Sequence, residues 1–287
     1  MSIAQLAGGK VNSRVKKASR RDGVIIGAYI TLSIIAVMSV VGFFYTPYDP
    51  VALYVGTPSD YPSLEHLFGT DDLGRDILSR VMAGTAVSVI SPIAVVILAT
   101  TFGSLIGILS AWYGGIVDGL FARVIDVIFA IPGLVLAILA VAVFGKGLTA
   151  PIIALSIAYI PITARLIRSV ARSELSKPYF AALWVQGVTP ASSLFKHLLP
   201  ALVPALLAQA AVGYGYAMLD LAAISFLGLG LQPPQTDWGS MVASGQPSIL
   251  SGAPEQSLFP AILIVITVLS VSLIGARITE WAERKLQ

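Results

Sequence analysis

Residues 179–200 read YFAALWVQGVTPASSLFKHLLP and lie between two long apolar runs. Gly187 and Pro190 interrupt the stretch, and two side chains near its end can carry positive charge, so it is too polar and too broken to cross a bilayer. Pro suits the first turn of a helix and Gly the position just past its end. The stretch therefore predicts two short helices at an angle, the first over about 178–187 and the second from Pro190 toward Pro200, with Thr189 as its cap.

The first of these helices carries an aromatic face. The helical period places Phe180, Leu183, Trp184 and Gly187 together, with Tyr179 beside them. Exposed aromatic side chains need a cover. Lipid headgroups provide one, because aromatic residues favour the membrane interface, and a groove on a partner protein provides another.

The composition of the whole chain indicates an integral membrane protein. Of its 287 residues, 56% are hydrophobic and only 11% charged, and the mean hydropathy is +0.85. Cysteine is absent, which excludes disulfides and thiolate metal sites. Since about 20 apolar residues cross the hydrocarbon core, we predict an all-α protein with six transmembrane helices, at about 24–44, 86–111, 124–144, 149–164, 201–226 and 258–276.

The distribution of Lys and Arg predicts the orientation. Six spans place all but three of the 18 Lys and Arg residues on one side, and the exceptions are Arg75, Arg80 and Lys146. Because positive charge concentrates in the cytoplasm, both termini and the 165–200 loop are expected there. The first span is expected to remain uncleaved, because no small-x-small site follows it.

The segment LFGTDDLGRDILSRVMAG, at 67–84, predicts a short amphipathic helix on the outer surface before the second span. Thr70 is its expected N-cap, and Asp76 and Arg80 form an i,i+4 pair. Its apolar face consists of Leu73, Ile77, Leu78 and Val81.

Two other features concern packing. The GxxxG pair Gly103–Gly107 in the second span predicts close helix approach, and Pro92, Pro132 and Pro161 are candidates for kinks. The long outer loop 227–257 contains leucines that predict contact with the bundle.

Motifs of enzyme chemistry are missing from the sequence. There is no phosphate-binding GxxxxGK[ST], no HExxH and no GxSxG. His66 and His197 are expected to be surface residues. The sequence therefore predicts neither a catalytic site nor a bound cofactor or metal, and nothing in it indicates nucleic-acid binding.

Two carboxylates fall within or beside spans, where charge is costly. Asp126 is expected to form an interfacial ion pair with Arg123. Asp220, in the outer half of its span after Tyr214 and Tyr216, is a candidate for lining a water-filled path.

Residues in this inner loop match a known family. The spacing Ala182-x4-Gly187, followed twelve residues later by Leu199-Pro200, resembles the EAA loop of binding-protein-dependent ABC importer permeases. Three further segments resemble the second permease subunit of the dipeptide, oligopeptide and nickel group: LFGTDDLGRDILSRVMAG, GGIVDGLFARVIDVIFAIPGLVLAI and SFLGLGLQPPQTDWGSM.

The resemblance implies a type I importer fold, MetI-like, with a core permease domain at 65–287 preceded by a basic tail, first span and outer loop at 1–64. It implies a second homologous permease, two cytoplasmic ATPase subunits that bind ATP and Mg²⁺, and an extracytoplasmic binding protein, in a bacterial plasma membrane. The implied ATPase-coupling residues are Tyr179, Phe180, Ala182, Leu183, Trp184, Gly187 and Pro200.

The inner loop departs from the family pattern at two positions. Ala181 replaces its usual glutamate and Leu183 its second alanine, so contact with the ATPase would be more apolar. Peptide is the substrate class that the resemblance favours, with nickel complexes, glutathione-like compounds and oligosaccharides left open. A secondary transporter and a membrane anchor are the alternatives; the first would favour inverted repeats and more intramembrane acids.

Overall fold

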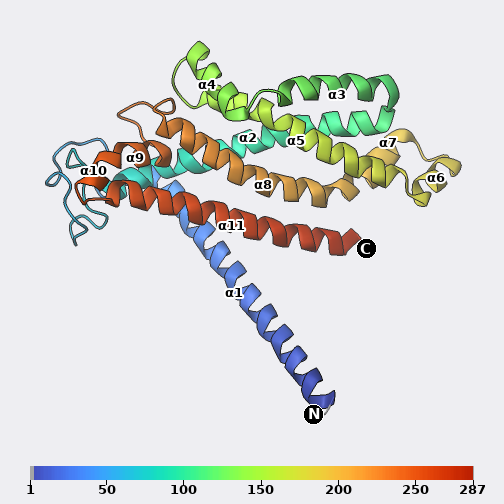
Figure 1. Cartoon of the computed structure of the whole chain (residues 1–287), viewed down its shortest axis with the longest axis horizontal. Helices are drawn as coiled ribbons and strands as arrows, with labels where there is room; N and C mark the ends of the chain where they lie inside the picture. The colour runs from blue at the N-terminus through green and yellow to red at the C-terminus, as the bar shows by residue number, and fades with distance from the viewer. Residues whose placement is uncertain (1–2, 287) are drawn as a thin grey trace.

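A computed structural model describes the backbone of residues 3–286 and the side chains of residues 23–282 and 284. The described chain is a long helical bundle without a β-strand (Figure 1). Its long helices are α1 (Ile3–Phe44), α2 (Ile77–Tyr113), α3 (Gly115–Phe129), α4 (Gly133–Phe144), α5 (Thr149–Leu175), α8 (Leu199–Phe226) and α11 (Glu255–Leu286). Shorter helical segments are α6 (Pro178–Val185), α7 (Pro190–Ser193), the π-helical turn η1 (Leu194–Leu198), α9 (Trp238–Ser244) and α10 (Gln246–Leu250).

Five helices are long and apolar enough to cross a membrane, and α3 with α4 forms a sixth, bent segment. The expected span at 124–144 corresponds to this bent pair, and the kink expected at Pro132 is present. The first part begins at Gly115 and the two helices meet at 75°. Pro132 lies at the break, where its ring prevents the helix from continuing, whereas Pro92 and Pro161 lie inside unbroken helices.

The GxxxG prediction is confirmed by the contact between α2 and α5. A Cβ atom at Gly103 would lie 2.7 Å from Thr163 Cβ, and one at Gly107 would lie 2.7 Å from the Ala164 carbonyl oxygen. Only glycine permits this approach of the two backbones. α2 and α5 thus form the closely packed centre of the bundle.

α5 is longer than the predicted span 149–164, because it continues to Leu175. Two contacts stabilise the added turns. Ile167 and Ala171 are buried, and Arg168 and Arg172 both pair with Asp118 of α3, the second at 2.6 Å. The inner loop therefore leaves the helical bundle only at Ser176.

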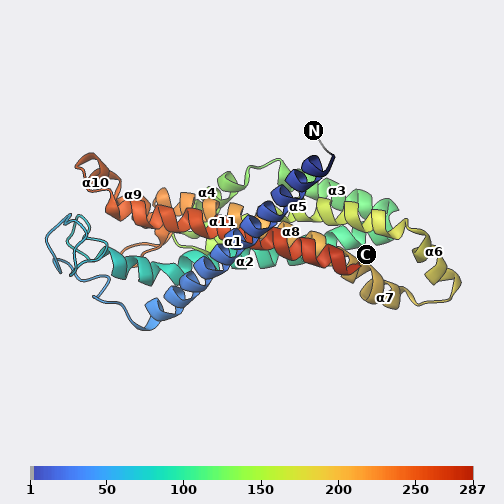
Figure 2. The same cartoon turned by 90° about the horizontal axis from the view of Figure 1, so that it is seen from below.

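α1 crosses the bundle obliquely and packs on α2 and α11 (Figures 1 and 2). Most of its side chains after residue 22 are exposed, although Ala28 and Ile35 are buried. Gly42 lies directly against the Met82 carbonyl group. An exposed apolar helix of this kind is suited to contact with lipid.

The predicted amphipathic helix before the second span is wrong. Residues 70–75 form turns, and α2 begins at Ile77 as one continuous helix that includes the second span. Its N-cap is Asp76, whose carboxylate accepts a hydrogen bond from Ser79 N, and not Thr70. Thr70 instead accepts from Asp60 N at 2.9 Å, which fixes the loop over the end of α2.

The outer loop 227–257 returns to the bundle, as predicted. It contains α9 and α10, and Trp238 of α9 is fully buried among α1, α8 and α11. Trp238 Nε1 donates to the Val81 carbonyl of α2 at 3.3 Å. Of the loop leucines, Leu229 packs on the core, whereas Leu227 is exposed.

Candidate coupling site

The inner loop projects past the end of the bundle as α6 and α7 (Figure 2). α6 begins at Pro178, as the sequence predicts, and ends at Val185. Gly187 follows with φ of +72°, and its N–H bonds to the Trp184 carbonyl at 3.1 Å, while Val188 N bonds to the Leu183 carbonyl at 3.0 Å. These paired bonds are a Schellman motif, which gives the projection a fixed turn.

The second predicted helix is not separate from the span that follows. Thr189 caps α7 by accepting from Ser192 N at 3.3 Å, but α7 continues through η1 into α8. The turn widens there, since Leu199 N–H bonds to the Leu194 carbonyl five residues back. Pro200 has no N–H for the preceding turn, and a π-helical turn accommodates that loss.

The predicted aromatic face of α6 is divided between the interior and the surface. Phe180 is 2% exposed and packs with Ile167, Leu198 and neighbouring residues of the bundle. Leu183 packs against the same cluster. Trp184 is 66% exposed, and Val185, which the sequence analysis passed over, is 89% exposed. Phe180 therefore holds the projection onto the bundle and cannot itself contact a partner.

The exposed remainder of the projection is small and apolar. Ala181, Ala182 and Gly187, close to Trp184 in the sequence, are exposed, and Pro200 is exposed at the start of α8. No charged side chain occurs between Pro178 and Phe195. The tip thus offers a rigid, uncharged surface centred on one indole ring.

Tyr179 belongs to a polar cluster at the base of α6. Its hydroxyl donates to Glu174 Oε1 at 2.6 Å, and Lys177 Nζ pairs with Glu174 Oε2 at 2.7 Å. Burial and the hydrogen bond to this carboxylate raise the pKa of Tyr179 above its ordinary value. Tyr179 thus connects α6 to the end of α5.

Asp126 does not pair with Arg123, so that prediction is wrong. It accepts from Arg165 Nη2 of α5 at 2.7 Å, and the same guanidinium lies 4.6 Å from the centre of the Phe129 ring. The partner is 39 residues away, and only the antiparallel packing of α3 on α5 brings it close.

The three candidate path-lining residues occupy different environments. Asp220 is half-buried, and its Oδ2 accepts from Tyr159 of α5 at 2.7 Å. Tyr216, four residues earlier on the same face of α8, is 63% exposed. Tyr214 points elsewhere: it is 6% exposed, and its hydroxyl faces the Val89 carbonyl. Tyr159 was missed because its connection to Asp220 arises only from tertiary packing.

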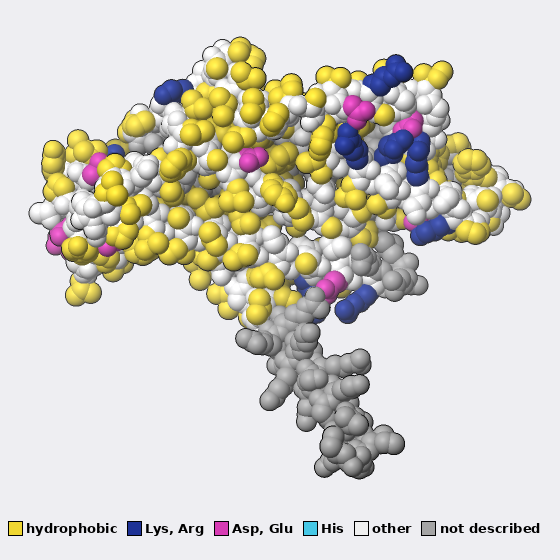
Figure 3. Space-filling model, in the orientation of Figure 1, with side chains coloured by type: hydrophobic (Ala, Val, Ile, Leu, Met, Phe, Trp, Pro, Cys, Tyr) yellow, Lys and Arg dark blue, Asp and Glu magenta, His cyan; other side chains and the backbone are white. Residues whose placement is uncertain are grey.

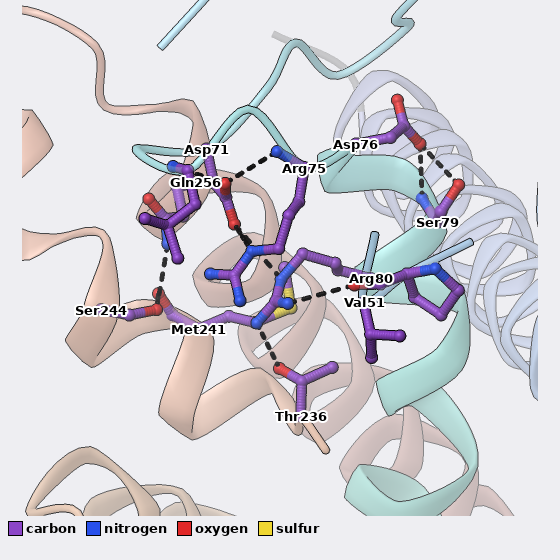
Figure 4. Close-up of polar contacts among 12 residues, drawn as sticks. Val51, Asp71, Arg75, Asp76, Ser79, Arg80, Thr236, Met241, Ser244 and Gln256 are labelled. Carbon is purple, nitrogen blue, oxygen red and sulfur yellow. Dashed lines mark hydrogen bonds and ion pairs between the residues drawn. The ribbon is translucent and has the colours of Figure 1, made fainter. Parts of the chain in front are cut away.

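A buried ionic cluster joins the outer segments (Figure 4). Asp71 accepts from Arg75 Nε at 2.6 Å and lies 3.5 Å from Arg80 Nε. Arg80 also donates to the Pro50 carbonyl at 3.2 Å and to Thr236 at 3.4 Å. One guanidinium thus connects the loop after α1, the start of α2 and the loop before α9.

The predicted Asp76–Arg80 pair does not form, and His66 is not a surface residue. His66 is buried, and its Nδ1 lies 3.0 Å from Asp76 Oδ1. Asp76 Oδ2 accepts from both the backbone and the hydroxyl of Ser79. The Asp76 carboxylate therefore faces into the outer loop, away from Arg80. His197 is half-buried at the inner end of the bundle.

Asp237 yields a prediction on stability. It caps α9 by accepting from Ser240 N, and its Oδ2 is buried without a hydrogen-bond partner. Burial raises the pKa of the Asp237 carboxyl, so its stabilising contribution is present at low pH and lost as pH rises through the folded-state value. Asp237→Asn keeps the cap without the charge. At neutral pH we expect this variant to melt about 2–4 °C above the unsubstituted protein, which corresponds to a gain of about 1 kcal/mol in the free energy of unfolding.

The control is Asp237→Ala, which removes the cap and should melt below the unsubstituted protein at every pH. Thermal unfolding of the detergent-purified chain between pH 4 and 8 checks both variants. A difference between Asp237→Asn and the unsubstituted protein that stays constant across this range would contradict the buried charge.

Among the described residues, no group of three His, Asp or Glu side chains could hold a metal ion.

Comparisons with known proteins agree with this architecture. Residues 103–287 match the family model described as "Binding-protein-dependent transport system inner membrane component". The chain is 35% identical over 276 residues to the dipeptide transport system permease protein DppC of Alkalihalophilus pseudofirmus, which covers 95% of this chain and 89% of that protein. It is 32% identical over 268 residues to the glutathione transport system permease protein GsiD of Pectobacterium atrosepticum. That alignment covers 93% of this chain and 89% of the relative.

Solved structures show the same fold. An inward-facing MetNI methionine ABC transporter matches with a TM-score of 0.52 and 22% identity, over 68% of this chain and 94% of that chain. An amino acid ABC transporter with histidines matches with a TM-score of 0.51 and 18% identity, over 73% of this chain and 93% of that chain. The type I importer fold is thereby confirmed, and the chain belongs to the family of binding-protein-dependent transport system inner membrane components.

Proposed function

We propose that this chain is one of two homologous permease subunits of an ATP-driven importer of di- or oligopeptides. The observation that carries the proposal is the 35% identity to a dipeptide permease along 95% of the chain, combined with a rigid apolar projection at one end of the bundle. Residues 65–287 form the core of the permease, and residues 1–64 supply an additional span and an outer loop. Both termini lie in the cytoplasm, and the bundle spans a bacterial plasma membrane.

The projection is the coupling element. Two cytoplasmic ATPase subunits bind ATP and Mg²⁺, and one of them receives Trp184, Val185 and the adjoining alanines in a cleft. Phe180 and Leu183 pack inward, so movement of the projection is transmitted to α5 and α8 as a rigid body. The permease chain itself hydrolyses no ATP, and an extracytoplasmic binding protein delivers the substrate at the opposite end.

ATP hydrolysis and transport are measured with the permease purified alone and with the purified complex, to test whether hydrolysis belongs to the ATPase subunits. The permease in detergent should show no ATP turnover, whereas the complex in liposomes should import a labelled dipeptide when ATP and the binding protein are present. Turnover by the isolated chain, or import that follows an ion gradient without ATP, would contradict the proposal.

Glutathione is the second candidate substrate, because the chain is 32% identical to a glutathione permease along 93% of its length. Competition between labelled dipeptide and unlabelled glutathione in the same liposomes separates the two. We expect the dipeptide to be imported at the lower concentration.

Asp220 and Tyr216 are proposed to line the translocation path, and the buried position of Tyr214 makes it a supporting residue. Asp220 forms no ion pair with a described residue, so its charge is available to the protonated amino group of a peptide. A charge-assisted hydrogen bond contributes about 1.5–3 kcal/mol. Asp220→Asn should therefore lower dipeptide uptake roughly tenfold while the complex still assembles.

Tyr214→Phe is the matched control, because it removes only a hydroxyl with a long contact of 3.4 Å, and uptake should remain within about twofold. Uptake by Asp220→Asn equal to that of the control would exclude Asp220 from the path.

A further inference from the structure

A groove of about 870 Å³ opens at the inner end of the bundle, beside the base of α6. α5, η1, α8 and α11 form its walls. Two of the residues that the family resemblance assigns to coupling, Tyr179 and Pro200, line the groove, whereas the exposed tip residues Trp184 and Val185 do not. Contact of the tip with an ATPase therefore leaves the interior of the groove without an assigned role.

The rim of the groove is basic. Lys177, Lys196 and His197 line it together with Glu174 and Tyr179. The Glu174 carboxylate is already occupied by Lys177 Nζ at 2.7 Å and by the Tyr179 hydroxyl at 2.6 Å. The side chains of Lys196 and His197 make no hydrogen bond or ion pair with any described side chain. Lys196 and His197 therefore offer donors on the rim that no described carboxylate occupies.

The floor of the groove is apolar and made of small residues. Pro200, Pro204 and Ala208 follow one another at intervals of four along α8, with Ala201 and Ala205 beside them. Val170 of α5 and Thr279 of α11 stand on either side. Since large side chains are missing from this face, the floor forms a trough that follows the axis of α8.

Rim and floor are arranged along the direction that crosses the membrane. From Lys196 to Ala208 the helix rises by about 18 Å, which runs from the headgroup region into the hydrocarbon. Basic side chains gather toward the end of the molecule that carries α6 and α7, whereas the middle is predominantly hydrophobic (Figure 3). A ligand that fits would have an anionic head outside the hydrocarbon and an apolar tail within it.

We propose that the groove binds one anionic phospholipid of the cytoplasmic leaflet. Lys196 and His197 receive its phosphate, with Lys177 adjacent, and an acyl chain lies along Pro204 and Ala208. Pockets of this kind between transmembrane helices bind anionic headgroups. The lipid contacts α5, η1 and α8 at once, so it would stabilise the junction from which the projection extends. The proposal requires only that these helices span the membrane, and it does not depend on the substrate.

Native mass spectrometry of the complex released from nanodiscs tests the proposal. The nanodiscs contain phosphatidylcholine with 20% phosphatidylglycerol, and the measurement is the number of phosphatidylglycerol molecules retained. We expect selective retention by the unsubstituted protein and at least a fivefold loss with Lys196→Gln combined with His197→Gln. Lys146→Gln, which removes an exposed cation at the opposite end, is the control and should retain the lipid.

A second variant examines the floor. Ala208→Leu fills the trough while leaving the rim charges in place, and it should reduce phosphatidylglycerol retention to a similar degree. Added inorganic phosphate should not displace the lipid, because a free anion lacks the acyl contact. Equal retention by the rim variant and the Lys146→Gln control would overturn the proposal. The proposal would also be overturned if the rim variant retained phosphatidylglycerol but lost its ATPase subunits. Lys196 and His197 would then contact an acidic surface of the ATPase and not a lipid.

Discussion

The Trp184→Asp variant is expected to insert into the membrane normally but to lose its ATPase subunits during purification. Trp184 is 66% exposed at the tip of a projection whose turn is fixed by a Schellman motif. Buried tryptophans are among the residues that contribute most to interfaces, at about 2–4 kcal/mol each. A carboxylate in the same pocket would add an unpaired buried charge. The combined loss exceeds a hundredfold in affinity.

Trp184→Phe is the matched control, because it keeps an apolar ring and should retain most of the bound ATPase. Protein levels in the membrane fraction monitor insertion, and the amount of ATPase recovered on the tagged permease measures association. Full recovery with Trp184→Asp would contradict the docking role of α6.

A substitution at Gly187 tests the same interface by changing the backbone conformation that follows α6. The Gly187 φ of +72° is inaccessible to proline, which requires about −65°, although no atom would obstruct a side chain there. Gly187→Pro should therefore redirect α7 and abolish ATPase recovery. Gly187→Asn is the control, since asparagine tolerates this conformation and should preserve association.

The second large effect is expected at the outer end, where Asp71→Asn should destabilise the fold by about 3–5 kcal/mol. The Asp71 side chain is fully buried and accepts from Leu73 N, Arg75 N and Arg75 Nε, while Arg80 lies 3.5 Å away. An amide cannot balance the buried guanidinium of Arg80 and the half-buried guanidinium of Arg75, and its NH₂ would face another donor. The apparent melting temperature should fall by roughly 6–12 °C.

Asp72→Asn is the control, because this neighbouring carboxylate is exposed and should shift the melting temperature by less than about 2 °C. Thermal unfolding in detergent, together with protease cleavage of the 45–76 loop, checks both variants. Equal melting of the two variants would mean that the cluster does not hold the outer segments.

Local signals predicted the features that depend on backbone chemistry. Gly187 ends α6, Pro178 begins it, and Gly103 and Gly107 mark the contact of α2 with α5. In each case one residue type meets a steric requirement that few others meet, so sequence alone was sufficient.

The errors arose where tertiary contacts determine the outcome. Thr70 and Asp76 are both plausible caps, and the choice between them depends on His66 and on Asp60, which bind them from the loop. Asp126 has Arg123 one turn away, yet it pairs with Arg165 through packing of α3 on α5. A helical period alone could not show which aromatic residues of α6 face inward.

The central claim is that the tip of α6 lies against an ATPase subunit, and a single-cysteine crosslink measures this directly. The chain contains no cysteine, so Val185→Cys, at an 89% exposed position, introduces one reactive thiol. Leu250→Cys, at a 91% exposed position on α10, is the control at the outer end. With a short thiol-to-amine crosslinker, position 185 should form a covalent adduct with an ATPase subunit and position 250 should form none. A thiol at 185 that reacts only with lipid-phase probes, and yields no adduct in an actively transporting complex, would contradict the account.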